Sequence, residues 1–225
     1  MTILQMTHLY KHWTPWANTY MYYPLTSDLK DVMWNWNTGT MHWTCTFNSS
    51  TGIHVTWKSG NYVTWMTCGI ANRNTFTFLI WSKIDAVNTS NYDGILWWYN
   101  STSASRVSTQ MENNRWSSWN YLQPRIFYWN SGFGTDITPD TNRHLYTFTG
   151  DGTSYKIYID GELKNSVSTS TKVNNITEFQ LWWGWYFWSG RSENWYIKDY
   201  IVETVARTAQ EVADYYNLTK WNYWL

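Results

Sequence analysis

Apolar and polar side chains alternate with a period of two residues along several short runs of this chain. A period of two is typical of a β-strand that buries one face and exposes the other. Polar clusters at 48–50 and 59–61 separate three such runs, which are Met41–Phe47, Ile53–Lys58 and Asn61–Cys68. We therefore expect three consecutive strands in this part of the chain.

Two consecutive hairpins are expected between His144 and Asn165. Glycine and aspartate at 150–152 tolerate the positive φ that tight turns need. Asp160 and Gly161 join two alternating runs, and an Asp-Gly pair in that position is a strong signal of a two-residue hairpin turn. The segment therefore predicts three antiparallel strands that follow one another directly.

The run Thr75–Ile84 is apolar on both faces in its middle, as expected for a central strand that is covered on both sides. Other strands are predicted where short apolar runs end at turn residues. These are Thr19–Leu25, which Pro24 ends, Gly94–Tyr99, Asn120–Trp129, Thr177–Trp183 and Trp195–Glu203.

One helix is predicted near the C-terminus. Thr208 followed three residues later by Glu211 forms a capping box, in which each side chain bonds a free backbone N–H of the first helical turn. Val212, Tyr215 and Tyr216 then fall on one face at helical spacing. Asn217 is expected to end the helix.

These elements predict an all-β protein, a single antiparallel jelly-roll β-sandwich with one short C-terminal helix. Residues 19–219 are assigned to this domain because no repeat or linker divides them, while residues 1–18 form an N-terminal arm and 220–225 an aromatic tail. We expect the aromatic tail to dock on its own domain or on a neighbouring subunit, and both ends to take part in assembly. The candidate assembly residues are Trp13, Trp16, Trp221, Tyr223 and Trp224.

The composition is rich in aromatic residues and poor in charge. The chain holds 20 tryptophans and 18 tyrosines, and its formal net charge is +0. Without a basic run, binding to nucleic acid or to an anionic membrane is not expected. No run reaches the roughly 18 apolar residues of a membrane span. The N-terminus also lacks the pattern of a signal peptide, so we expect synthesis in the cytoplasm.

Two interpretations remain open for the two cysteines. Cys45 and Cys68 lie in neighbouring predicted strands, so they form either a disulfide bridge or two buried free thiols. No Cys-x-x-Cys pair occurs, and no set of cysteines and histidines has the spacing of a zinc site.

Three segments follow one another in a characteristic order. The first is Tyr22–Leu25 with Asp28 and Asp31, and the second is Phe76–Lys83. The third is His144–Gly161, followed by Leu181–Gly184, Tyr196–Val202 and the capped helix. Together they resemble the concanavalin A-like lectin/glucanase superfamily in its laminin-G-like and pentraxin-like branch. The resemblance spans most of residues 19–217 and implies a jelly-roll protein that binds rather than catalyses, although fold alone does not establish function.

Catalysis and metal binding find little support in the motifs. Glucanases of this fold use paired carboxylates on one strand, and neither Glu-x-Asp-x-x-Glu nor Glu-x-Asp-x-Glu occurs here, so no catalytic residue is expected. The resemblance implies that Asp28, Asp31 and Asp199 match acids with which some members hold calcium, a cation that prefers oxygen ligands. The alternative is that Asp28 and Asp31 cap a loop and Asp199 bonds the backbone. No other cofactor is expected.

Exposed tryptophan rings offer flat apolar faces to sugars, and nearby Asn, Asp and Ser side chains bond the hydroxyls. The 20 tryptophans exceed what one core uses, so some are expected at a surface or interface. The candidate residues for a glycan site or an interface are Trp97, Trp98 and Tyr99, then Trp116 and Trp119, and finally Trp182, Trp185 and Trp188.

The function that these features favour is a non-enzymatic structural or binding protein. Laminin-G-like domains that stand alone without an export signal resemble phage particle proteins, which implies a virion surface component such as a capsid decoration or fibre protein that also binds glycans. Its expected partners are other structural subunits, as a homo-oligomer or larger assembly, and cell-surface glycans. Its expected location is the virion surface or the extracellular space. The alternatives are a secreted carbohydrate-binding lectin module and, after it, a glycoside hydrolase.

Overall fold

A computed structural model describes the sandwich and the C-terminal helix, with gaps in several connections. The described residues are 18–33, 39–42, 45–55, 62–70, 75–84, 96–99, 108–113, 122–128, 131–135, 137–138, 140–169, 176–181 and 195–223.

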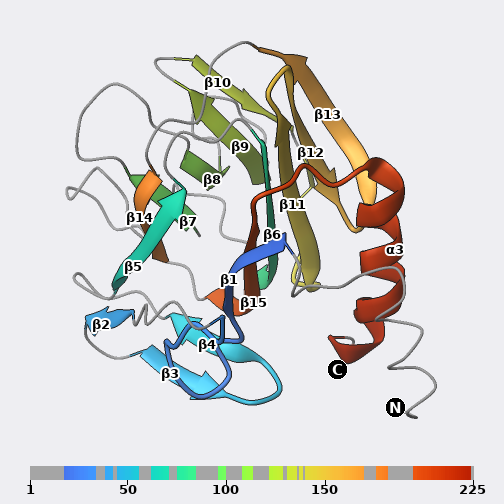
Figure 1. Ribbon diagram of the computed structural model, residues 1–225. Coiled ribbons are helices and arrows are strands. Elements are labelled where there is room, and N and C mark those ends of the chain that lie inside the picture. Colours follow the sequence, from blue (N-terminus) through green and yellow to red (C-terminus); the bar gives the residue numbers. More distant parts are fainter. Residues whose placement is uncertain are drawn as a thin grey trace.

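The larger sheet has eight strands and forms the centre of the molecule (Figure 1). They are β1 (Thr19–Tyr23), β3 (Cys45–Asn48), β4 (Gly52–Val55), β6 (Thr75–Ile84), β11 (His144–Asp151), β12 (Ser154–Ile159), β13 (Glu162–Ser168) and β15 (Trp195–Glu203). Their order is β13-β12-β11-β6-β15-β4-β3, and β1 also pairs with β15. One edge of β15 is thus shared, because its first residues pair with β4 and its last with β1.

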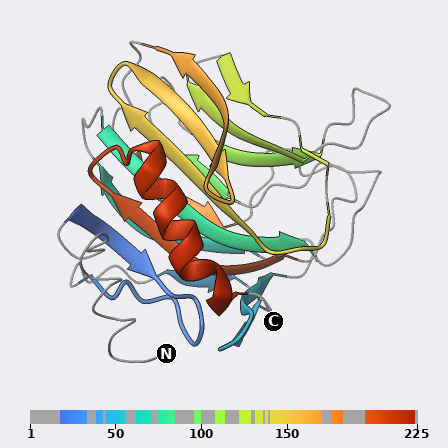
Figure 2. The ribbon, with the colours of Figure 1, turned by 90° about the vertical axis from the view of Figure 1, so that its right-hand side faces the viewer.

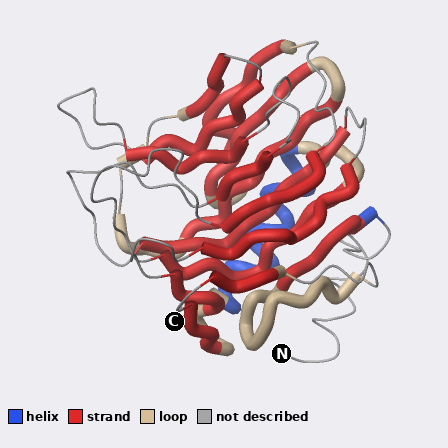
Figure 3. The backbone as a smooth tube through the Cα atoms, turned by 90° about the vertical axis from the view of Figure 1, so that its left-hand side faces the viewer, coloured by secondary structure: helices blue, strands red, loops and turns tan. Residues whose placement is uncertain are grey.

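Two smaller antiparallel sheets lie on one side of this large sheet. One has the order β2-β5-β14-β7 and the other β10-β9-β8. Their strands are β2 (Thr40–His42), β5 (Tyr62–Ile70), β7 (Leu96–Tyr99), β8 (Ser108–Asn113), β9 (Leu122–Tyr128), β10 (Ser131–Gly134) and β14 (Ile176–Leu181). Helix α3 (Ala209–Thr219) crosses the opposite side (Figures 2 and 3). The chain is therefore the expected antiparallel β-sandwich with one short C-terminal helix.

Strand β6 shows why the sheet is buried on both faces. It lies between β11 and β15, and nearly every one of its residues is buried, so the prediction of a central strand is confirmed. Phe76, Phe78 and Ile80 belong to the cluster inside the sandwich. Leu79 and Trp81 point the other way and pack with Tyr215 of the helix. Alternation within one strand therefore builds two separate cores.

The predicted double hairpin is confirmed as β11, β12 and β13. At its second turn Asp160 has φ 53° and Gly161 has φ 83°, the pair of positive values that a two-residue type I′ turn requires. A Cβ added at Gly161 would lie 3.0 Å from the Cα of Ala213. Glycine therefore serves the turn and also lets α3 pack closely against the hairpin.

The capping box of α3 is confirmed. The Thr208 side chain accepts from the backbone N–H of Glu211, and the Glu211 side chain accepts from that of Thr208. The predicted end at Asn217 is wrong, because the helix runs to Thr219 and continues as a 3-10 turn, η1 (Lys220–Asn222). Asparagine ends a helix only where the chain turns away, and here Lys220 keeps helical backbone angles. Among the helices of the described residues, none is long and apolar enough to cross a membrane.

The single strand predicted at Met41–Phe47 is also wrong. Its start forms β2, which pairs with β5 in a smaller sheet, and its end forms β3, which pairs with β4 in the larger sheet. A period of two indicates which side chains are exposed, but it does not indicate which strand is the pairing partner. The pattern therefore gives no sign that the chain passes from one sheet to the other here. Strands β8 and β10 were not predicted at all.

Candidate functional site

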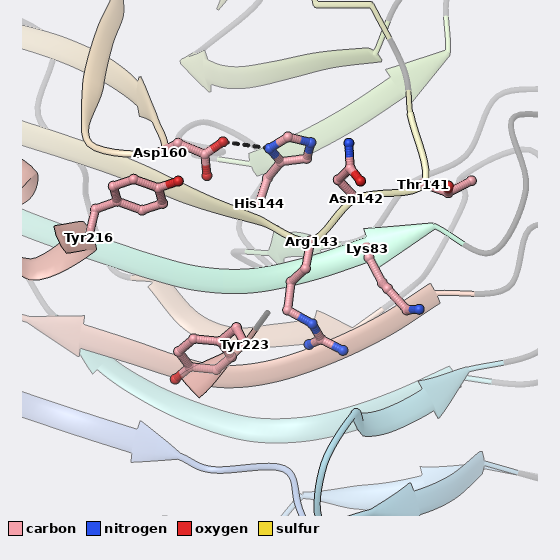
Figure 4. A pocket seen from close by; sticks show the side chains of 8 residues that line it. All are labelled: Lys83, Thr141, Asn142, Arg143, His144, Asp160, Tyr216 and Tyr223. Atoms are coloured by element: carbon pink, nitrogen blue, oxygen red, sulfur yellow. Dashed lines mark hydrogen bonds and ion pairs between the residues drawn. The ribbon is translucent and has the colours of Figure 1, made fainter. Parts of the chain in front are cut away.

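A cavity of about 430 Å³ lies beside α3, on the helix side of the larger sheet (Figure 4). Segments that are far apart in the sequence meet there: the end of β6, the loop before β11, the β12–β13 turn, α3 and the C-terminal segment. Their lining residues are Lys83, Thr141, Asn142, Arg143, His144, Asp160, Tyr216 and Tyr223. The lining therefore combines cations, hydrogen-bonding groups and two aromatic rings.

The hairpin turn positions a histidine at this cavity. Asp160 accepts the backbone N–H of Leu145 through Oδ1, at 2.9 Å. Its other oxygen lies 2.6 Å from Nδ1 of His144. The second ring nitrogen, Nε2, lies 3.0 Å from an oxygen of Asp140. Both imidazole nitrogens are thus engaged by carboxylates, which fixes the ring and leaves neither nitrogen to activate a nucleophile.

The two carboxylates also set the charge of His144. Burial disfavours the charged imidazolium, but the hydrogen bonds and negative charges of Asp160 and Asp140 outweigh burial and raise the pKa of His144 above its ordinary value. The protonated ring donates from both nitrogens, so it satisfies both carboxylates at once. His144 therefore acts as a rigid, positively charged part of the wall below its raised pKa.

Arg143 and Lys83 add two cations to the lining. Nη2 of Arg143 donates to the carbonyl oxygen of Thr51 at 2.8 Å, which holds the guanidinium in place. Nη1 is buried and has no hydrogen-bond partner among the described residues. The Lys83 ammonium lies 4.9 Å from the centre of the Tyr196 ring. Figure 4 shows the Arg143 side chain between His144 and Tyr223, with the Lys83 side chain next to it.

The C-terminal segment contributes the aromatic part of the lining. The Tyr223 ring stacks on Trp81 with 4.1 Å between ring centroids. Its hydroxyl donates to a carboxylate oxygen of Asp199. Tyr223 therefore docks on its own domain. For this tail residue, that resolves the choice between its own domain and a neighbouring subunit. Trp221, by contrast, is 73% exposed.

Asp199 is a buried carboxylate that joins both ends of the domain. It lies at a bulge of β15 with φ 54°, a conformation that aspartate tolerates better than most residues. Its two oxygens accept from the hydroxyls of Tyr223 and Tyr22, the latter at 2.7 Å. Burial raises the pKa of Asp199, and the two tyrosine hydrogen bonds oppose that rise.

The three acids considered for calcium do not form one site. Asp28 accepts the backbone N–H of Lys30 at 3.1 Å, and Asp31 accepts those of Tyr22 and Met33. The loop-capping alternative is therefore confirmed for both. For Asp199 the alternative of a backbone bond is wrong, because its partners are tyrosine hydroxyls. Within the described ranges, no three His, Cys, Asp or Glu side chains are grouped so that they could hold a metal ion.

The other predicted residues lie away from the cavity or outside the described residues. Trp97, Trp98 and Tyr99 form most of β7 in a smaller sheet, next to β14. The remaining candidates lie outside the described residues and stay predictions: Trp13, Trp16, Trp116, Trp119, Trp182, Trp185, Trp188 and Trp224. Cys45 is a buried free thiol, and burial raises its pKa to about 11.

The family follows from a match over most of the chain. The laminin G family model described as "Concanavalin A-like lectin/glucanases superfamily" matches residues 57–213. The chain belongs to this superfamily. The predicted resemblance is thereby confirmed, and the jelly-roll sandwich seen here is the superfamily's fold. No curated protein sequence matches the chain significantly.

Several solved structures share this concanavalin A-like fold at low sequence identity. A structure of botulinum neurotoxin type C is 12% identical with a TM-score of 0.69, over 94% of this chain and 52% of the other. The binding domain of Paraclostridial Mosquitocidal Protein 1 is 13% identical with a TM-score of 0.71, over 91% and 53%. Domain 4 of AbnA, an extracellular arabinanase from Geobacillus stearothermophilus, is 16% identical with a TM-score of 0.67, over 88% and 97%. The chain therefore spans about half the length of the two toxin structures and nearly all of the arabinanase domain.

Sequence reasoning missed most of the lining of the cavity. Once the first hairpin is paired, Leu145 lies opposite Asp160, so the Asp160–His144 contact could have been found from the predicted register. Lys83 reaches the same place only through the pairing of β11 with β6. No local signal in the sequence reveals that pairing.

Proposed function

We propose that this chain is a non-catalytic carbohydrate-binding module and that the cavity beside α3 is its glycan site. The observation that carries the proposal is the lining itself, in which the rings of Tyr216 and Tyr223 lie beside fixed polar groups of the loop and the turn. Aromatic surface and a few oriented polar groups are what a small-ligand site needs, and a cavity of about 430 Å³ has a suitable size.

The similar structures support a binding role. Domain 4 of AbnA was solved in complex with arabinotriose, and cell entry of botulinum neurotoxin type C depends on interaction with two ganglioside molecules. The engagement of both nitrogens of His144 by carboxylates also disfavours its use as a general base.

The test is a glycan array, followed by calorimetry with the oligosaccharide that binds best. Tyr216→Ala should weaken binding by about tenfold because it removes an aromatic face from the cavity. Trp221→Ala, which removes an exposed aromatic ring outside the lining, should leave the affinity unchanged. The bound oligosaccharide should be recovered intact after prolonged incubation.

Two results would contradict the proposal. An array on which no glycan binds would reject the carbohydrate-binding role. A loss confined to Trp97→Ala would instead place the glycan on β7 and reject the cavity.

We also propose that the module serves as a surface component of a particle, such as a phage capsid decoration or fibre protein, in contact with other subunits. The supporting feature is Trp221, an aromatic side chain that is exposed on η1 while its neighbour Tyr223 is docked. Large aromatic side chains often anchor protein interfaces.

Light scattering of the full chain and of Trp221→Ser tests this second role. Deleting residues 220–225 is less suitable, because it would also remove Tyr223 from its own domain. An assembly that dissociates in Trp221→Ser supports the role, whereas a full chain that is monomeric at all concentrations contradicts it.

A further inference from the structure

We propose that the cavity beside α3 selects acidic saccharides, with the Arg143 guanidinium and the Lys83 ammonium binding a carboxylate or sulfate group of the sugar. This inference rests on the proposed glycan site and adds to it the chemical class of the ligand.

The carboxylates at the cavity are paired with protein groups, whereas its cations form no ion pair in the described part of the chain. Among the described residues, the one carboxylate of the lining is Asp160, which is bonded to His144 at 2.6 Å and to the backbone of Leu145. Asp140, in the loop before β11, bonds the same imidazole and the backbone N–H of Asn142. The acidic groups at the cavity are therefore already paired with protein groups.

The two cations have no such partner. In the part of the chain that the structure describes, neither Arg143 nor Lys83 forms an ion pair with a carboxylate. Asp199 acts electrostatically on Arg143, and both of its oxygens accept hydrogen bonds from tyrosine hydroxyls. The cavity thus keeps two positive charges for an external anion.

Arg143 is also oriented for the task. Its Nη2 is held by the carbonyl oxygen of Thr51 at 2.8 Å, so the planar guanidinium does not rotate freely. Its buried Nη1 has no partner among the described residues, and an unpaired buried donor is costly. Two N–H groups of one guanidinium match the two oxygens of a carboxylate or sulfate. Because Nη1 is buried, an anion supplies its missing acceptor only after a small shift of the Arg143 side chain toward the cavity.

More cations surround the same aromatic surface. The Lys198 ammonium lies 5.1 Å from the centre of the Tyr223 ring, and that of Lys220 lies 5.3 Å from the centre of the Tyr216 ring. Two more cations therefore lie beside the aromatic side chains of the lining. A neutral saccharide would use the rings and hydrogen-bonding groups, but it would gain nothing from these charges.

The experiment compares lactose with its two acidic derivatives, 3′-sialyllactose and lactose 3′-sulfate, by calorimetry at low and moderate salt. The acidic sugars should bind at least about tenfold more tightly than lactose. Their advantage should shrink as sodium chloride is raised, because salt screens exposed charges. Inorganic sulfate alone is included to separate recognition of a sugar from simple anion binding.

Charge-removing variants assign the effect to residues. Lys83→Gln and Arg143→Gln should each reduce the affinity for the acidic sugars by about tenfold or more, and should reduce that for lactose much less, because glutamine keeps a hydrogen-bonding group but not the charge. Arg143→Lys keeps the charge but loses the paired N–H groups of the guanidinium, so its affinity should lie between those of Arg143→Gln and the wild-type chain. Lys164→Gln is the matched control, because Lys164 lies on β13 outside the lining and pairs with Glu162. It should behave as the wild-type chain does.

The outcomes separate the two proposals. If lactose and the acidic sugars bind equally and the charge variants change nothing, the selectivity for acidic saccharides is wrong while the glycan site stands. If inorganic sulfate binds as tightly as the acidic sugars do, the cavity recognises anions and not acidic saccharides. If no saccharide binds at all, the glycan site fails and the selectivity fails with it.

Discussion

The two faces of the larger sheet are both buried, but they are held together in different ways. On the sandwich face, the side chains of β6 and β11 pack in a cluster dominated by Phe76, Phe78 and Phe148. On the helix face, an aromatic cluster that includes Trp81 and Tyr223 lies beside ionisable groups. One face is thus apolar, and the other combines apolar contact with charge.

The ionisable groups of the helix face are arranged as buried pairs and networks. Arg207 donates to both oxygens of Glu203, at 2.7 and 2.9 Å, and Glu203 is fully buried. Asp199 accepts from two tyrosines. Directional bonds of this kind fix positions, whereas apolar packing supplies most of the stability. The face that carries the networks is also the face that carries the cavity.

The sandwich face should respond most strongly to truncation. Phe148→Ala removes a ring that is 1% exposed and should lower the free energy of unfolding by about 4 kcal/mol. Because no charge is involved, this loss should be the same at pH 5 and pH 8. Urea unfolding at both values measures it, with Leu163→Ala, an exposed residue of β13, as a control that changes little. A loss that depends on pH would contradict the contrast between the faces.

Breaking the ion pair on the helix face should cost about 3 kcal/mol. Arg207→Met leaves Glu203 buried without its cation, and an uncompensated buried charge is strongly destabilising. Burial already raises the pKa of Glu203, and the loss of Arg207 should raise it further. An acid whose pKa is higher in the folded state loses stability as pH rises, so this loss should grow from pH 5 to pH 8.

The double variant Glu203→Leu with Arg207→Met provides the control. It removes both charges, so it should recover most of the stability and also remove the dependence on pH. A double variant as unstable as Arg207→Met, with no dependence on pH, would show that the aliphatic packing of Arg207 mattered and not its charge.

The contrast between the faces also explains what the sequence could predict. The strands β6 and β15, the double hairpin and the capped helix follow from local periodicity and turn residues, because each is encoded within a short segment. The passage of the chain from β2 to β3 between sheets is not local and was missed. The same holds for the cavity, which forms where the helix face brings distant segments together.

Candidate site residues were expected among the tryptophans because large rings suit sugars. The cavity instead uses two tyrosines, of which Tyr223 was expected in an assembly contact. Asp199 was considered as a calcium ligand, but its neighbours Tyr22 and Tyr223 lie far from it in the sequence, so that partnership had no local signal.

Removing one hydroxyl from the network should have a moderate effect. Tyr223→Phe keeps the stack on Trp81 but removes one of the two hydrogen bonds to the Asp199 carboxylate. We expect a loss of about 1 to 2 kcal/mol at neutral pH. The loss should shrink at acidic pH, because burial raises the pKa of Asp199 and a protonated carboxyl needs these donors less. Urea unfolding at pH 4.5 and pH 7.5 compares the two conditions, and Tyr22→Phe should behave in the same way. Equal losses at both values would mean that the hydroxyl does not act through the charge of Asp199.

The smallest effect is expected at His144, the most exposed of these groups. Its pKa is higher in the folded chain than the unfolded value of about 6.5, because Asp160 and Asp140 favour the charged ring despite its burial. A raised histidine pKa stabilises the folded state fully below the unfolded pKa, and this stabilisation is lost as pH rises through the folded pKa. His144→Gln should therefore be less stable than the wild-type chain near pH 6, by about 1 kcal/mol or less, and nearly equal to it near pH 9. Thermal unfolding across this range measures the difference, and NMR titration of His144 gives its pKa directly.

Asp140→Asn should lower the pKa of His144 while leaving the hairpin intact, since the bonds of Asp160 to His144 and Leu145 remain. If the pKa of His144 does not change in Asp140→Asn, Asp140 does not contribute to the raised pKa, and Asp160 accounts for it.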